Sequence, residues 1–195
     1  MVARVGKACN HCGSGSYTEQ KEINPMNENK NTIEASLDPE VLNSTIEKMM
    51  DGLTTVAEAR GIAREELEGL YQVGYTYYNA GKLAEAEKVF HFLCSLSHTT
   101  AKYWLALGSA RQGLKNHKEA LLAYAMAAIL DPERPKAHYY AAECNLALGD
   151  CELAVSGVNS VLEMCPAGTP ENDKFRLKAE NLGKVAMAAL AKRQA

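Results

Sequence analysis

The chain has 195 residues, 47% of them hydrophobic, and a formal net charge of −3. This length accommodates one ordinary domain with tails, and the scattered lysines and arginines argue against a nucleic-acid partner. No apolar run approaches the roughly 18 residues that span a bilayer, and the N-terminus lacks the apolar core of a signal peptide. We therefore expect a soluble, cytoplasmic protein without stable membrane insertion.

Residues 1–35 are rich in Asn, Gly, Ser, Lys and Glu and carry almost no periodic apolar signal. We predict that they form a disordered extension. Within it, Cys9 and Cys12 have the spacing of zinc ligands, but a single pair cannot complete a tetrahedral site. We expect no metal there; the alternative is a site shared between molecules.

Residues 36–63 are predicted to form two N-terminal helices. The first begins at Pro39, which suits the first helical position, and ends at Gly52. The second follows Thr55, whose partner Glu58 can complete a capping box. The first helix carries an apolar stripe at i, i+4, i+7. We interpret this stripe as a candidate dimer interface, with packing onto the chain's own first repeat as the alternative: Leu42, Ile46 and Met49.

Residues 64–168 repeat with a period of 34. Small residues recur at two positions of each copy, and a large apolar residue recurs at a third: Gly74, Gly108, Ala142; Ala86, Ala120, Ala154; Phe90, Tyr124, Val158. The pattern is that of the tetratricopeptide repeat (TPR), a hairpin of two helices. We therefore predict an all-α fold, a solenoid of three repeats with a concave surface. The helices are expected at roughly 65–80 with 83–97, 100–113 with 117–130, and 134–148 with 151–164.

The turns inside the three hairpins are marked by Gly81, Lys115 and Gly149. Lysine is unusual there, and we expect Asn116 to take the left-handed conformation in its place. Residues 169–195 are predicted to form a C-terminal capping helix that covers the open end of the solenoid. Its covering side chains would be Phe175, Leu182, Val185 and Ala189.

Two stripes run along the first helix of the first repeat. Leu70, Val73, Gly74 and Tyr77 match the packing positions of the hairpin, and a second stripe lies roughly 120° away. One partner helix cannot bury both stripes, although a wide core remains the alternative. We predict that the second stripe and its counterparts line a concave client-binding groove: Tyr71, Tyr75, Tyr78; Lys102, Leu105, Ser109, Gln112; Lys136, Tyr139, Glu143, Leu146.

One familiar ligand of TPR domains does not fit this groove. TPR co-chaperones that clamp a C-terminal carboxylate use Lys, Asn and Arg at five positions. Of the residues at these positions here, only the lysine fits: Tyr71, Tyr75, Ala106, Lys136 and Tyr140. We therefore expect an extended apolar segment as the ligand.

The sequence carries no motif of an enzyme or of a cofactor site. His91, Cys94 and His98 share one helix face, but Cys94 lies toward the packing side and no acidic residue accompanies it. We expect neither catalysis nor metal binding from these residues, and no cofactor.

Local strings of the chain resemble the class II type III secretion chaperones (the SycD/LcrH/IpgC group) over about residues 38–165. They are Leu70-Tyr71, Lys88-Val-Phe-His-Phe-Leu-Cys94, Gly108-Ser-Ala-Arg-Gln112, Ala141-Ala-Glu-Cys144 and Ser156-Gly157. The resemblance implies a bacterial, cytoplasmic, ATP-independent chaperone and a homodimer, often formed through the N-terminal helices. It also implies that hydrophobic translocator proteins bind in the concave groove and stay soluble before export. The alternative is a TPR adaptor that joins other proteins.

Overall fold

The computed structural model describes residues 39–52 and 54–194. The predicted extension 1–35, with Cys9 and Cys12, lies outside the described residues. The chain divides into two units after Asn43, and α2 (Pro39–Met50) crosses that division. The architecture that follows belongs to the second unit, which the structure describes over residues 44–52 and 54–194.

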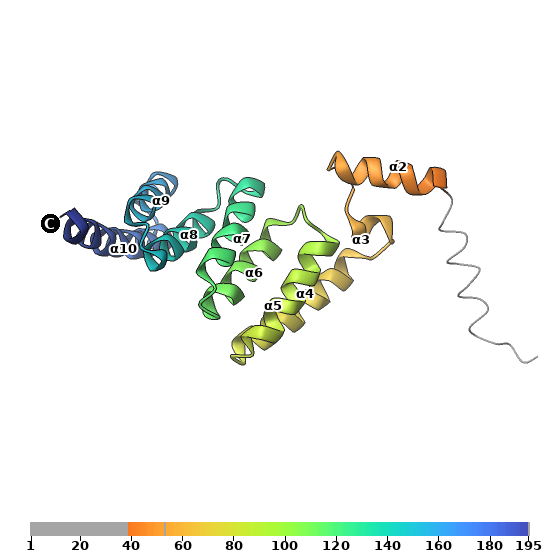
Figure 1. Cartoon of the computed structure of the whole chain (residues 1–195), viewed down its shortest axis with the longest axis horizontal. Coiled ribbons are helices and arrows are strands. Elements are labelled where there is room, and N and C mark those ends of the chain that lie inside the picture. Colours follow the sequence, from red (N-terminus) through yellow and green to blue (C-terminus); the bar gives the residue numbers. More distant parts are fainter. Residues whose placement is uncertain (1–38, 53, 195) are drawn as a thin grey trace, which may run out of the picture. The chain divides into compact units, whose positions relative to one another are not determined.

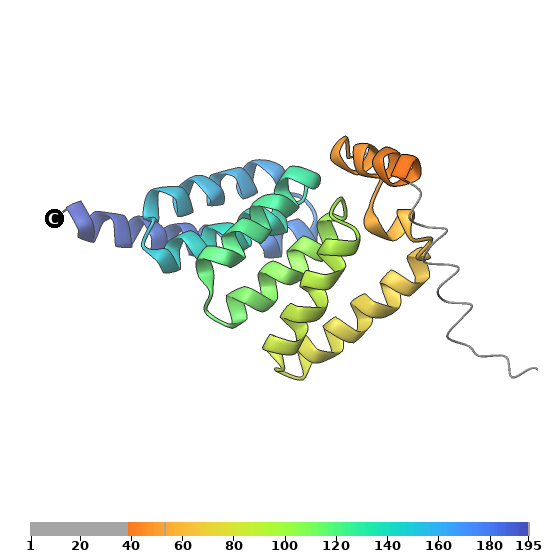
Figure 2. The same ribbon diagram turned by 45° about the vertical axis from the view of Figure 1, so that its right-hand side comes forward.

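Every regular element in the described residues is a helix. After the short α3 (Val56–Ala59), the helices follow one another in antiparallel pairs, coloured from yellow to blue in Figures 1 and 2. They are α4 (Arg64–Asn79) with α5 (Leu83–Leu96), α6 (Ala101–Gly113) with α7 (His117–Leu130), α8 (Pro135–Leu148) with α9 (Cys151–Met164), and finally α10 (Pro170–Gln194). The bounds differ from those predicted for the three repeats by at most one residue at either end, and those of α7 and α9 are as predicted.

From α4 onward, each helix packs mainly on its neighbours in sequence. The first helices of the three repeats also touch one another, α4 with α6 and α6 with α8. A solenoid arises in this way, because a single hairpin leaves one apolar face uncovered until the next hairpin covers it. The first helices thus form one continuous side of the stack.

In each of the first two hairpins, a glycine of the first helix packs against an aromatic ring of the second helix. A Cβ atom on Gly74 would lie 2.6 Å from the Phe90 ring, and one on Gly108 would lie 2.5 Å from the Tyr124 ring. Phe90 and Tyr124 are fully buried. The period-34 glycines therefore serve close packing, since only hydrogen at Cα lets the ring of the second helix approach the first.

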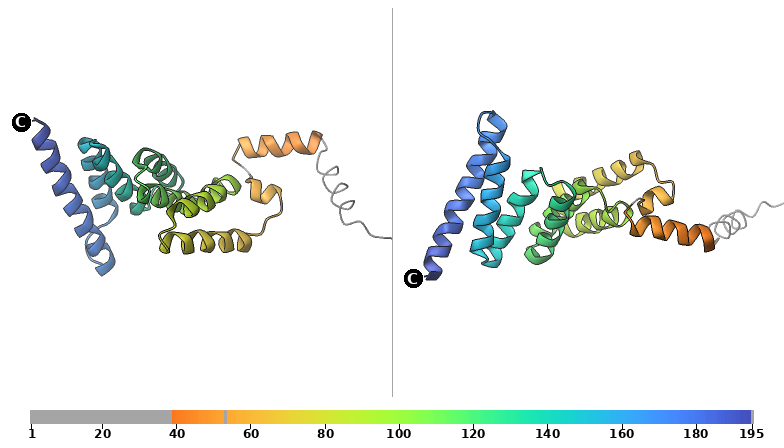
Figure 3. Two further views of the ribbon diagram at one scale, coloured as in Figure 1. Left: turned by 60° about the horizontal axis from the view of Figure 1, so that its bottom comes forward. Right: turned by 90° about the horizontal axis from the view of Figure 1, so that it is seen from above.

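The third hairpin and α10 pack differently. Ala142 stands at the position of the glycines and Val158 at the position of the aromatic rings. Both join Val161 and Ala179 in a second core cluster. Figure 3 shows α10 running alongside α9. Of the predicted covering side chains, Phe175 and Leu182 pack against this cluster, but Val185 is 57% exposed. The prediction for Val185 was wrong because the small residues Ala179, Gly183 and Ala186, which let α10 approach closely, occupy its buried side.

Local structure agrees with the sequence predictions except at Asn116 and Val73. Thr55 and Glu58 form the predicted capping box. Lys115 itself adopts the left-handed conformation, with φ of 66°, whereas Asn116, the N-cap of α7, has a φ of −81°. The expectation for Asn116 was therefore wrong. Val73, assigned to the packing stripe, is 47% exposed, because the buried Gly74 beside it takes up the contact with α5.

Candidate functional site

The side formed by the first helices carries a pocket of about 450 Å³. Three tyrosines of α4 form one wall, α6 supplies the middle, and the start of α8 closes the far end. The lining residues are Tyr71, Tyr75, Tyr78, Phe90, Lys102, Leu105, Ala106, Ser109, Arg134, Lys136 and Tyr140. Aromatic rings and aliphatic side chains thus surround it, with cations at its rim.

Tyr71 is held firmly in this wall. Its ring lies 5.7 Å from that of Phe90 and 5.9 Å from that of Tyr103, between centroids, and it stacks on Tyr75 at 6.4 Å. Tyr71 is half-buried, while Tyr75 is 47% exposed. One face of the aromatic stripe therefore packs on the core and the other remains open to a ligand.

An ion pair lies at the α4 edge of the pocket. The Lys102 ammonium donates to the Glu68 carboxylate at 2.6 Å and lies 3.9 Å from the centre of the Tyr71 ring, a cation–π contact. The hydrogen bond from Lys102 lowers the pKa of Glu68, and burial raises the pKa of Tyr71. At neutral pH this wall is thus an uncharged phenol beside a neutralised ion pair, which suits apolar ligands.

The floor of the pocket comes from the second helices. The Phe90 ring of α5 reaches the pocket against Gly74. In the next repeat the Tyr124 hydroxyl donates to Gln112 Oε1 at 2.7 Å and lies 3.4 Å from Ser109 Oγ. Gln112 in turn donates to Glu143 at 2.9 Å. The polar groups under the middle of the groove therefore satisfy one another rather than facing a ligand.

The predicted groove residues fall into two groups. Those that line the pocket are Tyr71, Tyr75, Tyr78, Lys102, Leu105, Ser109 and Lys136. Gln112, Tyr139, Glu143 and Leu146 lie outside its lining. Tyr139 packs on Phe175 of α10, with ring centroids 5.3 Å apart, and its pKa is raised by burial.

Four lining residues were missed among the groove predictions: Phe90, Ala106, Arg134 and Tyr140. The carboxylate-clamp positions already held the signal for two of them, because all five of those positions line the pocket, Ala106 and Tyr140 included. Phe90 was assigned to the core, which is also correct, since it is fully buried. Arg134 precedes α8 and pairs with Asp131 at 2.6 Å.

The predicted dimer stripe lies on α2. Ile46 is 44% exposed. The side chains of Leu42 and Met49 are outside those that the structure describes.

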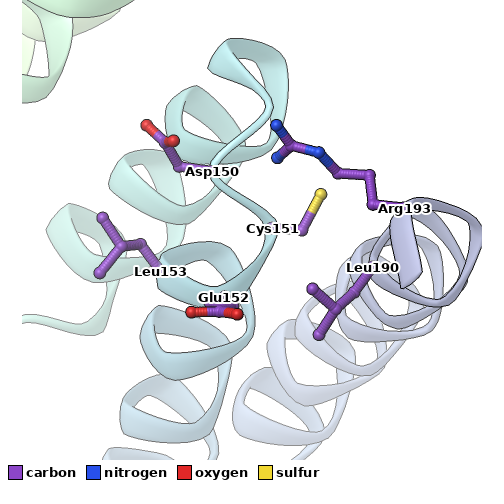
Figure 4. Close-up of a pocket in the computed structure, with 6 residues that line it drawn as sticks. All are labelled: Asp150, Cys151, Glu152, Leu153, Leu190 and Arg193. Carbon is purple, nitrogen blue, oxygen red and sulfur yellow. The ribbon is translucent and has the colours of Figure 1, made fainter.

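A second hollow, of about 400 Å³, lies where the C-terminal end of α10 meets the turn between α8 and α9. Figure 4 shows Leu190 and Arg193 projecting from α10 toward the start of α9, where Cys151 lies. Arg193 donates to the carbonyl of Gly149, the residue that caps α8. A cation at a helix C-terminus is stabilising, so this contact fastens the end of α10.

The cysteines of the described residues behave as small apolar side chains. Cys94, Cys144, Cys151 and Cys165 are all free and buried. Burial raises the pKa of Cys94 to about 12 and that of Cys144 to about 11, so both remain thiols at neutral pH. Among the described residues no cluster of His, Cys, Asp and Glu could hold a metal ion, and no helix is both long and apolar enough to cross a membrane.

Comparisons with known proteins agree with this architecture. The tetratricopeptide repeat family model matches residues 67–99. Low calcium response locus protein H of Yersinia pseudotuberculosis is 33% identical over 137 residues, which cover 70% of this chain and 81% of that protein. The chain is also similar to chaperone protein SicA of Salmonella typhimurium, at 32% identity over 47% of this chain and 56% of that protein.

Solved structures extend the likeness to the fold. The type III secretion translocator chaperone SycD of Yersinia enterocolitica is 31% identical, with a TM-score of 0.63 over 68% of this chain and 98% of that one. PcrH in complex with the chaperone binding region of PopD is 37% identical, with a TM-score of 0.62 over 66% of this chain and 96% of that one. Fold, repeat pattern and sequence agree: the chain belongs to the class II type III secretion chaperones, the translocator chaperone family of LcrH, SycD, SicA and PcrH.

Proposed function

We propose that this chaperone binds an extended apolar segment of a hydrophobic translocator in the pocket between α4, α6 and α8, and so keeps the client soluble and competent for export. The observation that carries the proposal is the open aromatic wall of Tyr71, Tyr75 and Tyr78 beside Leu105. PcrH has been solved with the chaperone binding region of PopD, and SycD with a peptide of YopD. A chaperone with this task would act in the bacterial cytoplasm, before export.

The chemistry of the pocket supports an apolar client. Tyrosine rings bury a large area while their hydroxyl groups remain at a wet rim. Glu68, a carboxylate beside the wall, is already neutralised by Lys102. Affinity should be moderate, because ordering a flexible client segment costs conformational entropy. Moderate affinity also suits a client that must leave the chaperone for the export channel.

The remaining predicted groove residues would take a different role in this proposal. Gln112 and Glu143 would fix the α6–α8 contact through their hydrogen bond, and Tyr139 would anchor α10 through Phe175. Leu146 lies near the end of α8 and is half-buried. These residues would shape the groove without touching the client.

The test is co-expression with a hydrophobic type III translocator from the bacterium that encodes this chain. Tyr75→Glu places a charge in the apolar wall at an exposed position, so the fold should persist and the client should become insoluble. Tyr75→Phe is the matched control and should keep the client soluble. A client that stays soluble and bound with Tyr75→Glu would overturn the proposed groove.

We also propose that the chain forms a homodimer through α2. Ile46 and Met50, one turn apart, are 44% and 83% exposed, and apolar surface of this kind favours association. SycD, a member of the same family, has been solved in an alternative dimer. Leu42→Glu combined with Ile46→Glu should give monomers in analytical ultracentrifugation, and persistent dimers would move the interface elsewhere.

A further inference from the structure

A third hollow, of about 260 Å³, adjoins the proposed client groove. It lies between the start of α8 and the first half of α10. Pro135, Phe175 and Cys165 form an apolar floor, and Lys136, Lys174 and Lys178 stand around it. Lys136 lines this hollow and the client pocket alike, so the two hollows share that side chain.

The three lysines stand together around this hollow. All three are exposed, and no carboxylate whose side chain the structure describes lies within ion-pair distance of them. The side chain of Glu171, one turn before Lys174, is outside the described side chains. Neighbouring cations are already paired, Arg134 with Asp131 and Arg176 with Glu180. In a chain of net charge −3, this is a local surplus of positive charge.

One acidic group close to Lys174 is occupied elsewhere. Asp173 lies beside Lys174 in sequence, and its carboxylate accepts a hydrogen bond from the backbone N–H of Gly168 at 3.2 Å. It therefore helps to fix the turn before α10 rather than neutralise the lysines. Lys174 and Lys178 are one turn apart on α10, so both can face one ligand with Lys136 opposite them.

We propose that this hollow is a basic subsite that binds acidic side chains of the client next to its apolar anchor. The inference rests on the proposed function. The apolar anchor would occupy the aromatic pocket, and the chain would continue past Lys136, where Asp or Glu meets the three ammonium groups. Such a subsite selects among apolar segments by charge, because rim charges add specificity and speed of encounter more than affinity.

The experiment uses the full-length chain and a displayed library of random twelve-residue peptides. The wild type should enrich peptides with an apolar anchor and Asp or Glu at a consistent distance from it. The triple variant K136Q/K174Q/K178Q should enrich the same anchors without the acidic residues. The matched control K88Q/K118Q/K184Q removes the same charge from exposed lysines outside both hollows and should select as the wild type does.

The enriched peptide then gives the size of the effect. Its Kd should rise about tenfold with the triple variant at low salt, since each exposed ion pair contributes modestly, and the difference should shrink below about twofold at 0.5 M salt. A version with Asn and Gln in place of the acids should bind wild type and variant equally. Apolar anchors enriched without acidic residues, or a Kd that the triple variant leaves unchanged, would overturn the subsite alone. Failure to enrich any apolar anchor would overturn the proposed groove as well.

Discussion

The first two repeats and the third use different residues where the two helices of each hairpin pack together. In the first two, glycine on the first helix admits a ring from the second, Gly74 with Phe90 and Gly108 with Tyr124. The Phe90 ring reaches the pocket, and the Tyr124 hydroxyl reaches Ser109 and Gln112 beneath it. The glycines that recur in the first two repeats thus make room for the rings that pack beneath the groove.

The third repeat has no such opening. Ala142 packs with Val158, and valine is too short to reach across the first helix. The exposed side of this repeat is instead taken by α10, where Phe175 meets Tyr139. Residues at equivalent positions of two repeats therefore need not have the same role. Tyr71 and Tyr139 lie two periods apart, yet Tyr71 lines the pocket and Tyr139 anchors the cap.

The largest expected effect is on the free energy of unfolding when the buried side chain of the second helix is truncated, in the first repeat and in the third. Phe90→Ala should lower the free energy of unfolding by about 4 kcal/mol, because it deletes a buried ring and leaves a cavity. Val158→Ala, the equivalent change in the third repeat, should cost about 2 kcal/mol. Urea denaturation followed by circular dichroism measures both. Equal losses would contradict the distinction between the repeats.

Filling a glycine position should disrupt the ring-over-glycine arrangement directly. Gly108→Val should destabilise the chain by about 3 kcal/mol, because the new side chain overlaps the buried Tyr124 ring. Gly69→Ala is the control: a Cβ there meets nothing within 4 Å, so the higher helix propensity of alanine should stabilise by up to about 1 kcal/mol. Thermal melting of the two variants should shift in opposite directions, and shifts of the same sign would contradict close packing at Gly108.

The smallest effect concerns the ion pair at the edge of the aromatic wall. Glu68 has a lowered pKa in the folded chain, so its contribution is present at neutral pH and is lost as the pH falls through that lowered value. Both partners are more than a third exposed, which limits the contribution to about 0.5 kcal/mol. Glu68→Gln should therefore lower stability slightly at pH 7 and should match the wild type at the acidic end of the unfolding series. A difference that grows toward acidic pH would contradict the assignment.

The repeats could be predicted from the sequence because the packing of the helices requires small residues at a fixed spacing. Gly74, Gly108 and Ala142 recur at 34 residues since two helices must approach at each of them, and the helix bounds follow from that register. Positions that depend on neighbouring repeats were harder. One residue along a helix turns the side chain by about 100°, so the choice between Tyr139 and Tyr140 depends on how α8 is rotated against α6 and α10.

The same limit explains the misassigned side chains. Val185 and Ala186 are adjacent, and only the close approach of α10 to α9 decides which of them is buried. Lys115 takes the left-handed turn conformation although Asn116 is the better residue for it, because α7 must begin at His117 with Asn116 as its cap. In both places the tertiary geometry overrides the local preference of the residue.

The central claim is that the client lies along the aromatic side of the first helices. A photo-crosslinking amino acid placed at Tyr75, inside the pocket, should attach to a co-expressed translocator on irradiation. The same amino acid at Leu122 is the control, since Leu122 is 67% exposed on α7 and lies outside the pocket lining. We expect a crosslinked complex from position 75 and none from position 122; crosslinking from 122 alone would contradict the proposed groove.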